Sequence, residues 1–67
     1  MEKFSQNLKE LRLEKNLTQV QLAKETGLSQ TAIANWENEK RIPNINAIII
    51  FAKFFNVTAD YLLGLEN

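Results

Sequence analysis

The segment AKETGLSQTAIANWE, residues 23–37, decides the fold, because its Gly27 separates two short helical patterns. Neither pattern is long enough to stand alone, since isolated helices shorter than about 12–15 residues are marginal in water. Glycine commonly ends a helix in a left-handed conformation, and Ser29 is a typical N-cap for a following helix. We therefore expect two short helices that pack against each other across a sharp turn.

The rest of the chain shows the same helical pattern, with no strictly alternating segment. The segment ENEKRIPN, residues 37–44, is expected to be a loop, because Pro43 and the residue before it disfavour helix. The helices are predicted at about residues 3–15, 18–25, 29–37, 45–55 and 58–63. Their expected caps are Asn16, a capping box of Thr18 with Gln21, Gly27, Ser29, Asn44, Asn56, Thr58 and Gly64.

Composition limits the kind of protein. The 67 residues include eight basic and eight acidic side chains, and neither cysteine nor histidine. The lack of both residue types removes disulfides and the commonest metal ligands. The longest apolar run, AIIIFA at residues 47–52, is too short to span a bilayer, and the N-terminus lacks the apolar core of a secretory signal. We expect a single cytoplasmic domain over residues 1–67, with no metal, cofactor, membrane contact or small-molecule ligand.

The apolar positions predict a compact all-α bundle of five helices. Trp36 falls on the inner side of its helix, so its indole N–H should need a hydrogen-bond partner. The expected core residues are Phe4, Leu8, Leu11 and Leu17 in the first helix and its end, then Val20, Leu22, Ala23, Leu28, Ile33 and Trp36, and finally a stripe of Ile45, Ile48, Ile49, Ala52 and Phe55.

The other side of the helix at residues 29–37 carries short, uncharged side chains that form hydrogen bonds, together with one methyl group. These residues are Gln30, Thr31, Ala34 and Asn35. Any surface helix needs a solvated face, and that is the alternative interpretation of this pattern.

The chain resembles the phage-repressor and Cro-like (lambda-repressor-like) helix-turn-helix DNA-binding family. The resemblance runs from LTQVQLAKETGLSQTAIANWENEKRIP, residues 17–43, into VTADYLL, residues 57–63. It is carried by the combined spacing of Gln19, Ala23, Gly27, Ile33 and the pair Trp36–Glu37. It implies that the second and third helices form a helix-turn-helix, whose third helix lies in the major groove of DNA.

The resemblance also implies roles for individual residues. Gln30, Thr31, Ala34 and Asn35 become base-reading residues, because Gln and Asn pair with adenine and a methyl meets the thymine methyl. This face lacks arginine, which favours a half-site rich in A·T pairs. The implied phosphate contacts are Gln19, Ser29, Asn38, Lys40, Arg41 and Arg12, and Arg12 is also expected to form an ion pair with Glu37. Lys40 and Arg41 could equally belong to an ordinary charged loop.

Two positions depart from the family pattern. Glu39 stands where glycine is common, so a left-handed backbone there is expected to shift to Asn38 or to relax. Ile50 stands where a polar group is common, and with Phe54 it lies off the expected inward stripe. These two residues are predicted to form an exposed apolar patch, which often marks an association site. The incidental alternative is a single surface isoleucine.

The leading hypothesis is a sequence-specific DNA-binding transcriptional regulator of the repressor type. It would bind a palindromic double-stranded operator as a weak homodimer, assembled with the help of DNA. The alternative is a protein-interaction module, such as an antitoxin that holds a partner through an apolar face. An enzyme is rejected, because the sequence shows no nucleophile–base pair, phosphate-binding glycine loop or metal-ligand cluster.

Overall fold

The computed structural model describes residues 1–66, which form five α-helices and no strand. The helices are α1 at Glu2–Glu14, α2 at Gln19–Thr26, α3 at Gln30–Glu37, α4 at Ile45–Phe55 and α5 at Ala59–Leu63. The predicted all-α class and the five helices are confirmed, with boundaries within one residue of those expected. None of the described helices is long and apolar enough to cross a membrane.

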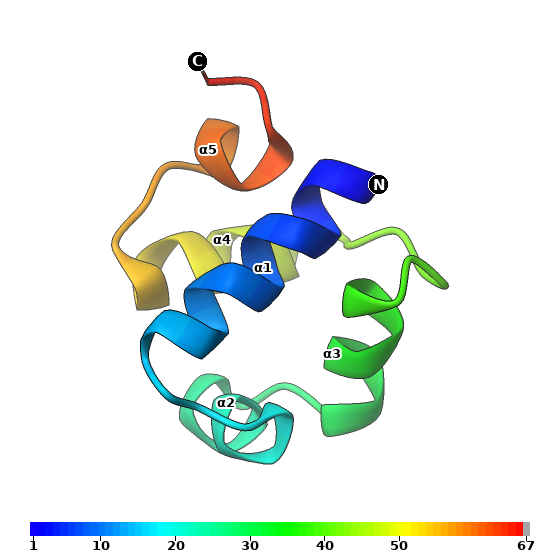
Figure 1. Ribbon diagram of the computed structural model, residues 1–67, viewed down its shortest axis with the longest axis vertical. Helices are drawn as coiled ribbons and strands as arrows, with labels where there is room; N and C mark the ends of the chain where they lie inside the picture. Colours follow the sequence, from blue (N-terminus) through cyan, green and yellow to red (C-terminus); the bar gives the residue numbers. More distant parts are fainter. Residues whose placement is uncertain (67) are drawn as a thin grey trace.

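The longest helix, α1, runs across the molecule and contacts α3 and α5 (Figure 1). The short helix α2 packs against α3 and α4, and α4 also contacts α5. The N-terminal end of α1 and helix α5 lie at the same end of the molecule, opposite α2 (Figure 1). Helix α3 therefore packs against α1 and α2, while Gln30 and Thr31 on its other side are exposed.

The helix ends follow the expected cap residues. The Thr18 hydroxyl accepts a hydrogen bond from the Gln21 backbone N–H at 3.0 Å, and the Gln21 side chain accepts one from the Thr18 N–H at 2.8 Å. Asn44 caps α4 and Thr58 caps α5 through one bond each, in which the side-chain oxygen accepts from a backbone N–H of the first turn. These bonds satisfy backbone donors that a helix leaves unpaired in its first turn.

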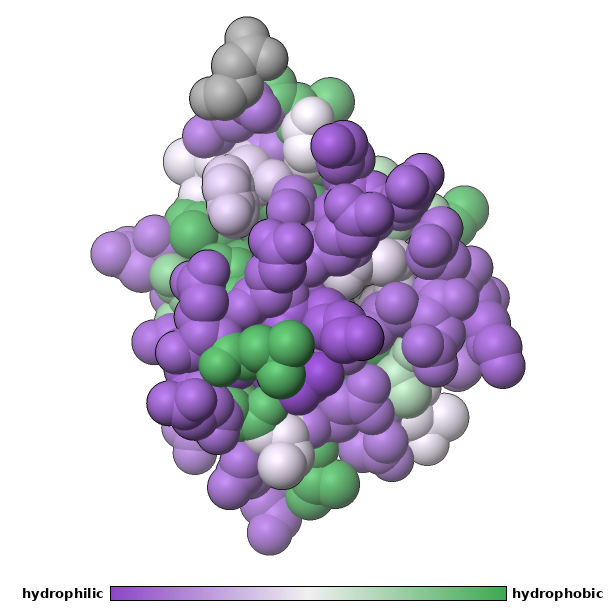
Figure 2. Space-filling model, viewed as in Figure 1, coloured by the Kyte–Doolittle hydropathy of each residue, from purple (hydrophilic) through white to green (hydrophobic). Residues whose placement is uncertain are grey.

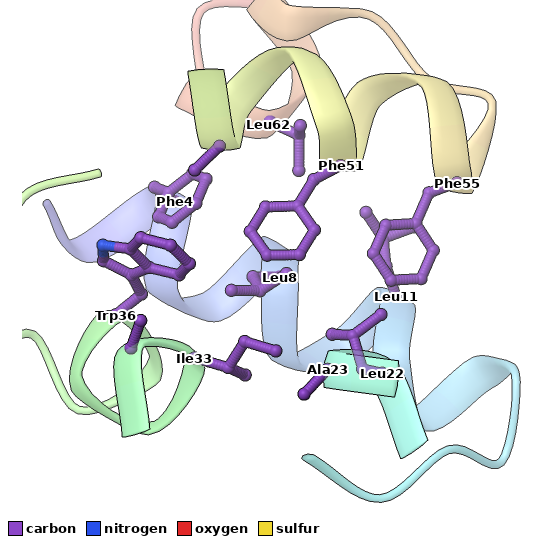
Figure 3. Close-up of a cluster of buried hydrophobic side chains, with 12 residues drawn as sticks. Phe4, Leu8, Leu11, Leu22, Ala23, Ile33, Trp36, Phe51, Phe55 and Leu62 are labelled. Atoms are coloured by element: carbon purple, nitrogen blue, oxygen red, sulfur yellow. The ribbon is translucent and has the colours of Figure 1, made fainter. Parts of the chain in front are cut away.

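Phenylalanines of α4 form the centre of the core. The Phe51 ring is fully buried and packs edge-on against Trp36 of α3, with ring centroids 5.7 Å apart. Phe4 of α1 lies on the same side of Phe51 as Trp36 (Figure 3), and its ring centroid is 6.3 Å from that of Phe51. One aromatic cluster therefore joins α1, α3 and α4. The other large side chains that are fully buried are Leu8, Leu22, Ile33 and Leu62.

Three residues expected in the core are exposed instead: Val20 by 52%, Ile45 by 76% and Ile49 by 45%. Val20 lies about 200° around α2 from the buried Leu22, so both cannot face inward. The same relation separates Ile45 from Ala47 and Ile49 from Phe51 in α4. In the pair Ile49 and Phe51, the larger phenylalanine occupies the core because its burial removes more apolar area from water.

The predicted apolar patch at Ile50 and Phe54 is less exposed than expected, since both residues are half-buried. Phe54 packs edge-on against Phe55 with ring centroids 5.0 Å apart, and the Lys15 ammonium lies 5.8 Å from the Phe54 ring centroid. The face viewed in Figure 2 is mostly hydrophilic, with small separate hydrophobic areas. The more exposed isoleucines are Ile42, Ile45 and Ile49.

Candidate nucleic-acid interface

The turn between α2 and α3 determines how α3 is presented. Gly27 ends α2 with φ of 75°, and its N–H donates to the Ala23 carbonyl at 2.9 Å. Ser29 then caps α3, because its hydroxyl accepts from the Ala32 N–H at 3.1 Å. Only two residues, Leu28 and Ser29, separate Gly27 from the first residue of α3. The turn is therefore short, and the start of α3 lies at the surface.

Helix α3 has two different sides. Ala32, Ile33 and Trp36 are buried against the core. On the other side Gln30 and Thr31 are exposed, while Ala34 and Asn35 are half-buried. The four residues expected to read bases therefore share the surface that α1 and α2 leave free. Their side chains offer amide and hydroxyl groups without formal charge, together with one methyl group.

The residues expected to contact phosphates lie around this surface. Asn38, Lys40 and Arg41 are exposed in the loop that follows α3, and Ser29 is exposed at the start of the helix. The Ser29 oxygen is used as a helix cap, and its hydroxyl proton remains available to donate. Their contacts with phosphate remain predictions.

The backbone at Glu39 differs from the expectation. Glu39 itself adopts the left-handed conformation with φ of 61°, whereas Asn38 has φ of −95°. The predicted shift to Asn38 is wrong. The Lys40 N–H donates to the Asn35 carbonyl at 2.8 Å, and the Glu39 N–H donates to the Trp36 carbonyl at 3.3 Å. These bonds close the end of α3 and require the left-handed residue at position 39.

Arg12 of α1 and Glu37 of α3 lie together as a bidentate ion pair. Arg12 Nε donates to Glu37 Oε2 at 2.7 Å, and a terminal Arg12 nitrogen donates to Glu37 Oε1 at 2.9 Å. The other terminal nitrogen donates to the Leu17 carbonyl at 2.8 Å. The hydrogen bond with Glu37 raises the pKa of Arg12, so the guanidinium stays charged. Only 10% of the Arg12 side chain is exposed, and its phosphate contact remains a prediction.

Gln19 connects this ion pair to the outer side of α3. Its Nε2 donates to Glu37 Oε1 at 3.1 Å, and its Oε1 accepts from Gln30 Nε2 at 3.0 Å. Gln30 and Glu37 are seven residues apart, so they lie on the same side of α3, about 10 Å apart along its axis. Gln19, the first residue of α2, bridges them. The sequence predicts a role for each of these residues and for Arg12, but not the connection between them.

The Trp36 indole N–H also differs from the expectation. Its Nε1 is buried, and no acceptor within residues 1–66 lies at hydrogen-bond distance, so the expected partner is not found. The indole ring is instead held by contacts with Phe51. A buried donor without a partner is costly, and the apolar contacts of the ring offset that cost.

Comparison with known proteins identifies the family. A family model described as helix-turn-helix matches residues 8–62. The HTH-type transcriptional activator BcrR of Enterococcus faecalis is 47% identical over 64 residues, covering 96% of this chain and 31% of BcrR. The uncharacterised HTH-type transcriptional regulator YobD of Bacillus subtilis (strain 168) is 34% identical over 64 residues, covering 96% of this chain and 57% of YobD.

Another relative is closer in length. The control protein C.SmaI of Serratia marcescens is 36% identical over 67 residues, covering 96% of this chain and 80% of that protein. The chain thus spans most of C.SmaI but less than two thirds of BcrR and YobD. Because the matched segment includes α2, the turn at Gly27 and α3, the chain belongs to the helix-turn-helix family.

Proposed function

We propose that this chain is a sequence-specific DNA-binding transcriptional regulator. In this proposal α3 enters the major groove, and its exposed residues contact base edges. Membership of the helix-turn-helix family supports the proposal, as do the names of the relatives, which describe transcriptional regulators. The relatives include an activator, so the expected repressor role needs its own measurement with a reporter gene.

The observation that carries the proposal is the two-sided character of α3. Its inner side is fixed in the core by Ile33 and Trp36, so the helix has one orientation relative to the rest of the molecule. Its outer side presents Gln30, Thr31, Ala34 and Asn35 without an interfering charge. Glutamine and asparagine amides can form bidentate hydrogen bonds with adenine, and alanine and threonine methyls can contact thymine.

Flanking groups would supply affinity rather than sequence choice. Lys40, Arg41 and Asn38 extend from the loop after α3, and Ser29 and Gln19 lie at the starts of α3 and α2. Contacts from such groups to phosphates position a protein on the duplex without reading sequence. A symmetric dimer would place two copies of α3 one helical turn apart, about 34 Å, on a palindromic operator.

Selection of binding sites from random duplex DNA tests the proposal. We expect a palindromic consensus rich in A·T pairs. Affinity for that site and for a scrambled duplex is then compared between about 50 and 200 mM salt. A site that keeps its advantage over the scrambled duplex at high salt supports base reading. The absence of any consensus, with all affinity lost as salt rises, would overturn the proposal.

Two substitutions sharpen the same test. Gln30→Ala and Asn35→Ala should each remove the preference at one position per half-site and lower specific affinity by about tenfold, the effect of losing one bidentate base contact. Gln6→Ala is the matched control, because Gln6 is an exposed glutamine on α1 whose amide donates to Glu2 of the same helix. The control should bind as the unsubstituted chain does.

A further inference from the structure

We propose that Glu37 is a positioning residue that sets the hydrogen-bonding direction of Gln30 and thereby favours adenine at the position that Gln30 reads. This inference rests on the proposed function. The connection runs from Glu37 Oε1 to Gln19 Nε2 at 3.1 Å, and from Gln19 Oε1 to Gln30 Nε2 at 3.0 Å. A residue inside the protein would then control a base contact that it does not touch.

The direction of each bond follows from the chemistry of Glu37. An ionised carboxylate only accepts hydrogen bonds. Both of its oxygens already accept from Arg12, and Oε1 also accepts from Gln19. The Gln19 amide must therefore turn its NH₂ group toward Glu37 and its carbonyl oxygen toward Gln30. Gln30 must in turn use one N–H to reach that oxygen, because two carbonyl oxygens would repel each other.

The consequence appears at the exposed end of Gln30. A primary amide has two N–H groups and one carbonyl oxygen. When the N–H remote from the Gln30 carbonyl bonds Gln19, the carbonyl and the adjacent N–H remain for DNA. One acceptor beside one donor matches the N6 donor and N7 acceptor of adenine in the major groove. Gln30 is thus oriented for adenine before it meets the base.

Burial keeps this direction constant. The Glu37 side chain is 3% exposed and the Arg12 side chain is 10% exposed, so water competes little for their bonds. Gln19 is half-buried, and only Gln30 is exposed. Orientation is therefore imposed from the interior outward. A preoriented contact avoids part of the ordering cost of binding.

Replacing the Glu37 carboxylate with an amide should remove or reverse the direction of the hydrogen bonds that connect Glu37, Gln19 and Gln30. In Glu37→Gln the new NH₂ group can donate to Gln19 Oε1, which would turn the Gln19 NH₂ group toward Gln30. Gln30 would then accept from Gln19 and present N–H donors to the groove. Guanine offers two acceptors, O6 and N7, at this edge. We expect the ratio of affinity for adenine over guanine at that position to fall by about tenfold.

The experiment uses four duplexes that differ only in the base pair read by Gln30. That position is identified from the selected consensus as the one whose preference disappears in Gln30→Ala. Competition binding then gives the adenine-to-guanine ratio for the unsubstituted chain and for Glu37→Gln, with the position read by Asn35 as the internal control. Thermal unfolding shows whether the variant is folded.

A second variant covers the case in which Glu37→Gln does not fold. Gln19→Met removes the bridge and leaves the Arg12–Glu37 pair in place. It should lower overall affinity if Gln19 contacts a phosphate, but the decisive value is the ratio at the Gln30 position, which should also fall. Folded variants that lose affinity equally for all four duplexes, or keep the ratio unchanged, would overturn the inference. If the unsubstituted chain yields no consensus, it is the proposed function that fails.

Discussion

Glu39, two residues after the end of α3, has a backbone conformation that suits glycine, with φ of 61°. A left-handed conformation costs an L-residue roughly 1–2 kcal/mol, and glycine avoids this cost but loses about 0.5–1 kcal/mol through its freer unfolded chain. Glu39→Gly should therefore raise the free energy of unfolding by up to about 1 kcal/mol, or several degrees in Tm. Chemical denaturation measures the change. Asn38→Gly is the control, since Asn38 has φ of −95° and should gain nothing. Equal effects of the two substitutions would contradict the strain at Glu39.

The Arg12–Glu37 ion pair is largely buried, so the loss of one partner should be costly. Arg12→Met would leave a 3% exposed carboxylate with Gln19 as its remaining partner, and an uncompensated buried charge costs about 3 kcal/mol. Lys9→Met, at an exposed lysine of the same helix, should change the free energy of unfolding by less than about 0.5 kcal/mol. Urea denaturation of both variants at neutral pH gives the comparison.

The stability that the Arg12–Glu37 pair contributes depends on pH through the ionisation of Arg12. The pKa of Arg12 is raised by its hydrogen bond with Glu37, so its stabilising contribution is fully present below the ordinary pKa of arginine and is lost only as pH rises above it. The difference in stability between the unsubstituted chain and Arg12→Met should therefore stay constant between about pH 7 and 10. A difference that shrinks over this range would show that another group supplies the effect.

Each described helix is followed within two residues by one in the left-handed conformation. These residues are Asn16, Gly27, Glu39, Asn56 and Gly64. The glycines and asparagines were predictable as helix ends because those residue types tolerate positive φ. Glu39 was not, because its side chain has no such preference, and only the hydrogen bonds that close α3 require that conformation. Residue type therefore predicts the helix ends except at Glu39, where these backbone hydrogen bonds impose the left-handed conformation.

Helix α4 shows where sequence patterns become ambiguous. Its sequence, INAIIIFAKFF at residues 45–55, is apolar on almost every side, so the periodicity does not single out one inward stripe. The large rings decide the orientation, and Ile45 and Ile49 become exposed. In the candidate site the outer face of α3 was predictable from spacing. The Glu37–Gln19–Gln30 connection was not, because it depends on how α2 crosses α3.

The two glycines provide a test of helix ends that differ in their surroundings. A Cβ added at Gly27 would meet nothing within 4 Å, so Gly27→Ala should cost only the left-handed strain, roughly 1–2 kcal/mol. A Cβ at Gly64 would lie 2.5 Å from Lys3 Cβ, which adds a clash between the end of α5 and α1. Gly64→Ala should therefore destabilise the protein by about 1 kcal/mol more than Gly27→Ala. An equal or smaller loss for Gly64→Ala in urea denaturation would indicate that the end of α5 opens without affecting the core.

The whole molecule is small relative to the proposed operator. Helix α3 has eight residues and is about 12 Å long, so one copy reaches only a few base pairs. Two copies of α3 placed about 34 Å apart each lie about 17 Å from the twofold axis between them. The described molecule measures 29 × 24 × 20 Å, so two touching copies can satisfy this spacing. Dimerisation would therefore extend the sequence that is read without any change in the fold.

We predict that exposed isoleucines on α4 and in the loop before it form the contact between the two subunits. Ile45 and Ile49 are exposed one turn apart on α4, and Ile42 is exposed in the preceding loop, whereas Ile50 is half-buried. Burying exposed isoleucines against a second copy removes apolar area from water in both subunits. Ile45→Ser should therefore weaken binding to the palindrome while leaving binding to one half-site unchanged. In sedimentation, the complex of two subunits on DNA should dissociate at a higher protein concentration than it does for the unsubstituted chain.

Leu13→Ser is the matched control for this prediction, because Leu13 is 53% exposed on α1. Ile50→Ser tests the patch predicted from the sequence, which consists of Ile50 and Phe54. A loss in Ile50→Ser with none in Ile45→Ser would place the contact at the original patch, because a half-buried isoleucine can still contribute its exposed edge. Equal losses in Leu13→Ser and Ile45→Ser would contradict a specific contact on α4. Because the contact is small, it is expected to be weak in solution, and the shared duplex would hold the two subunits at the high local concentration that lets it form.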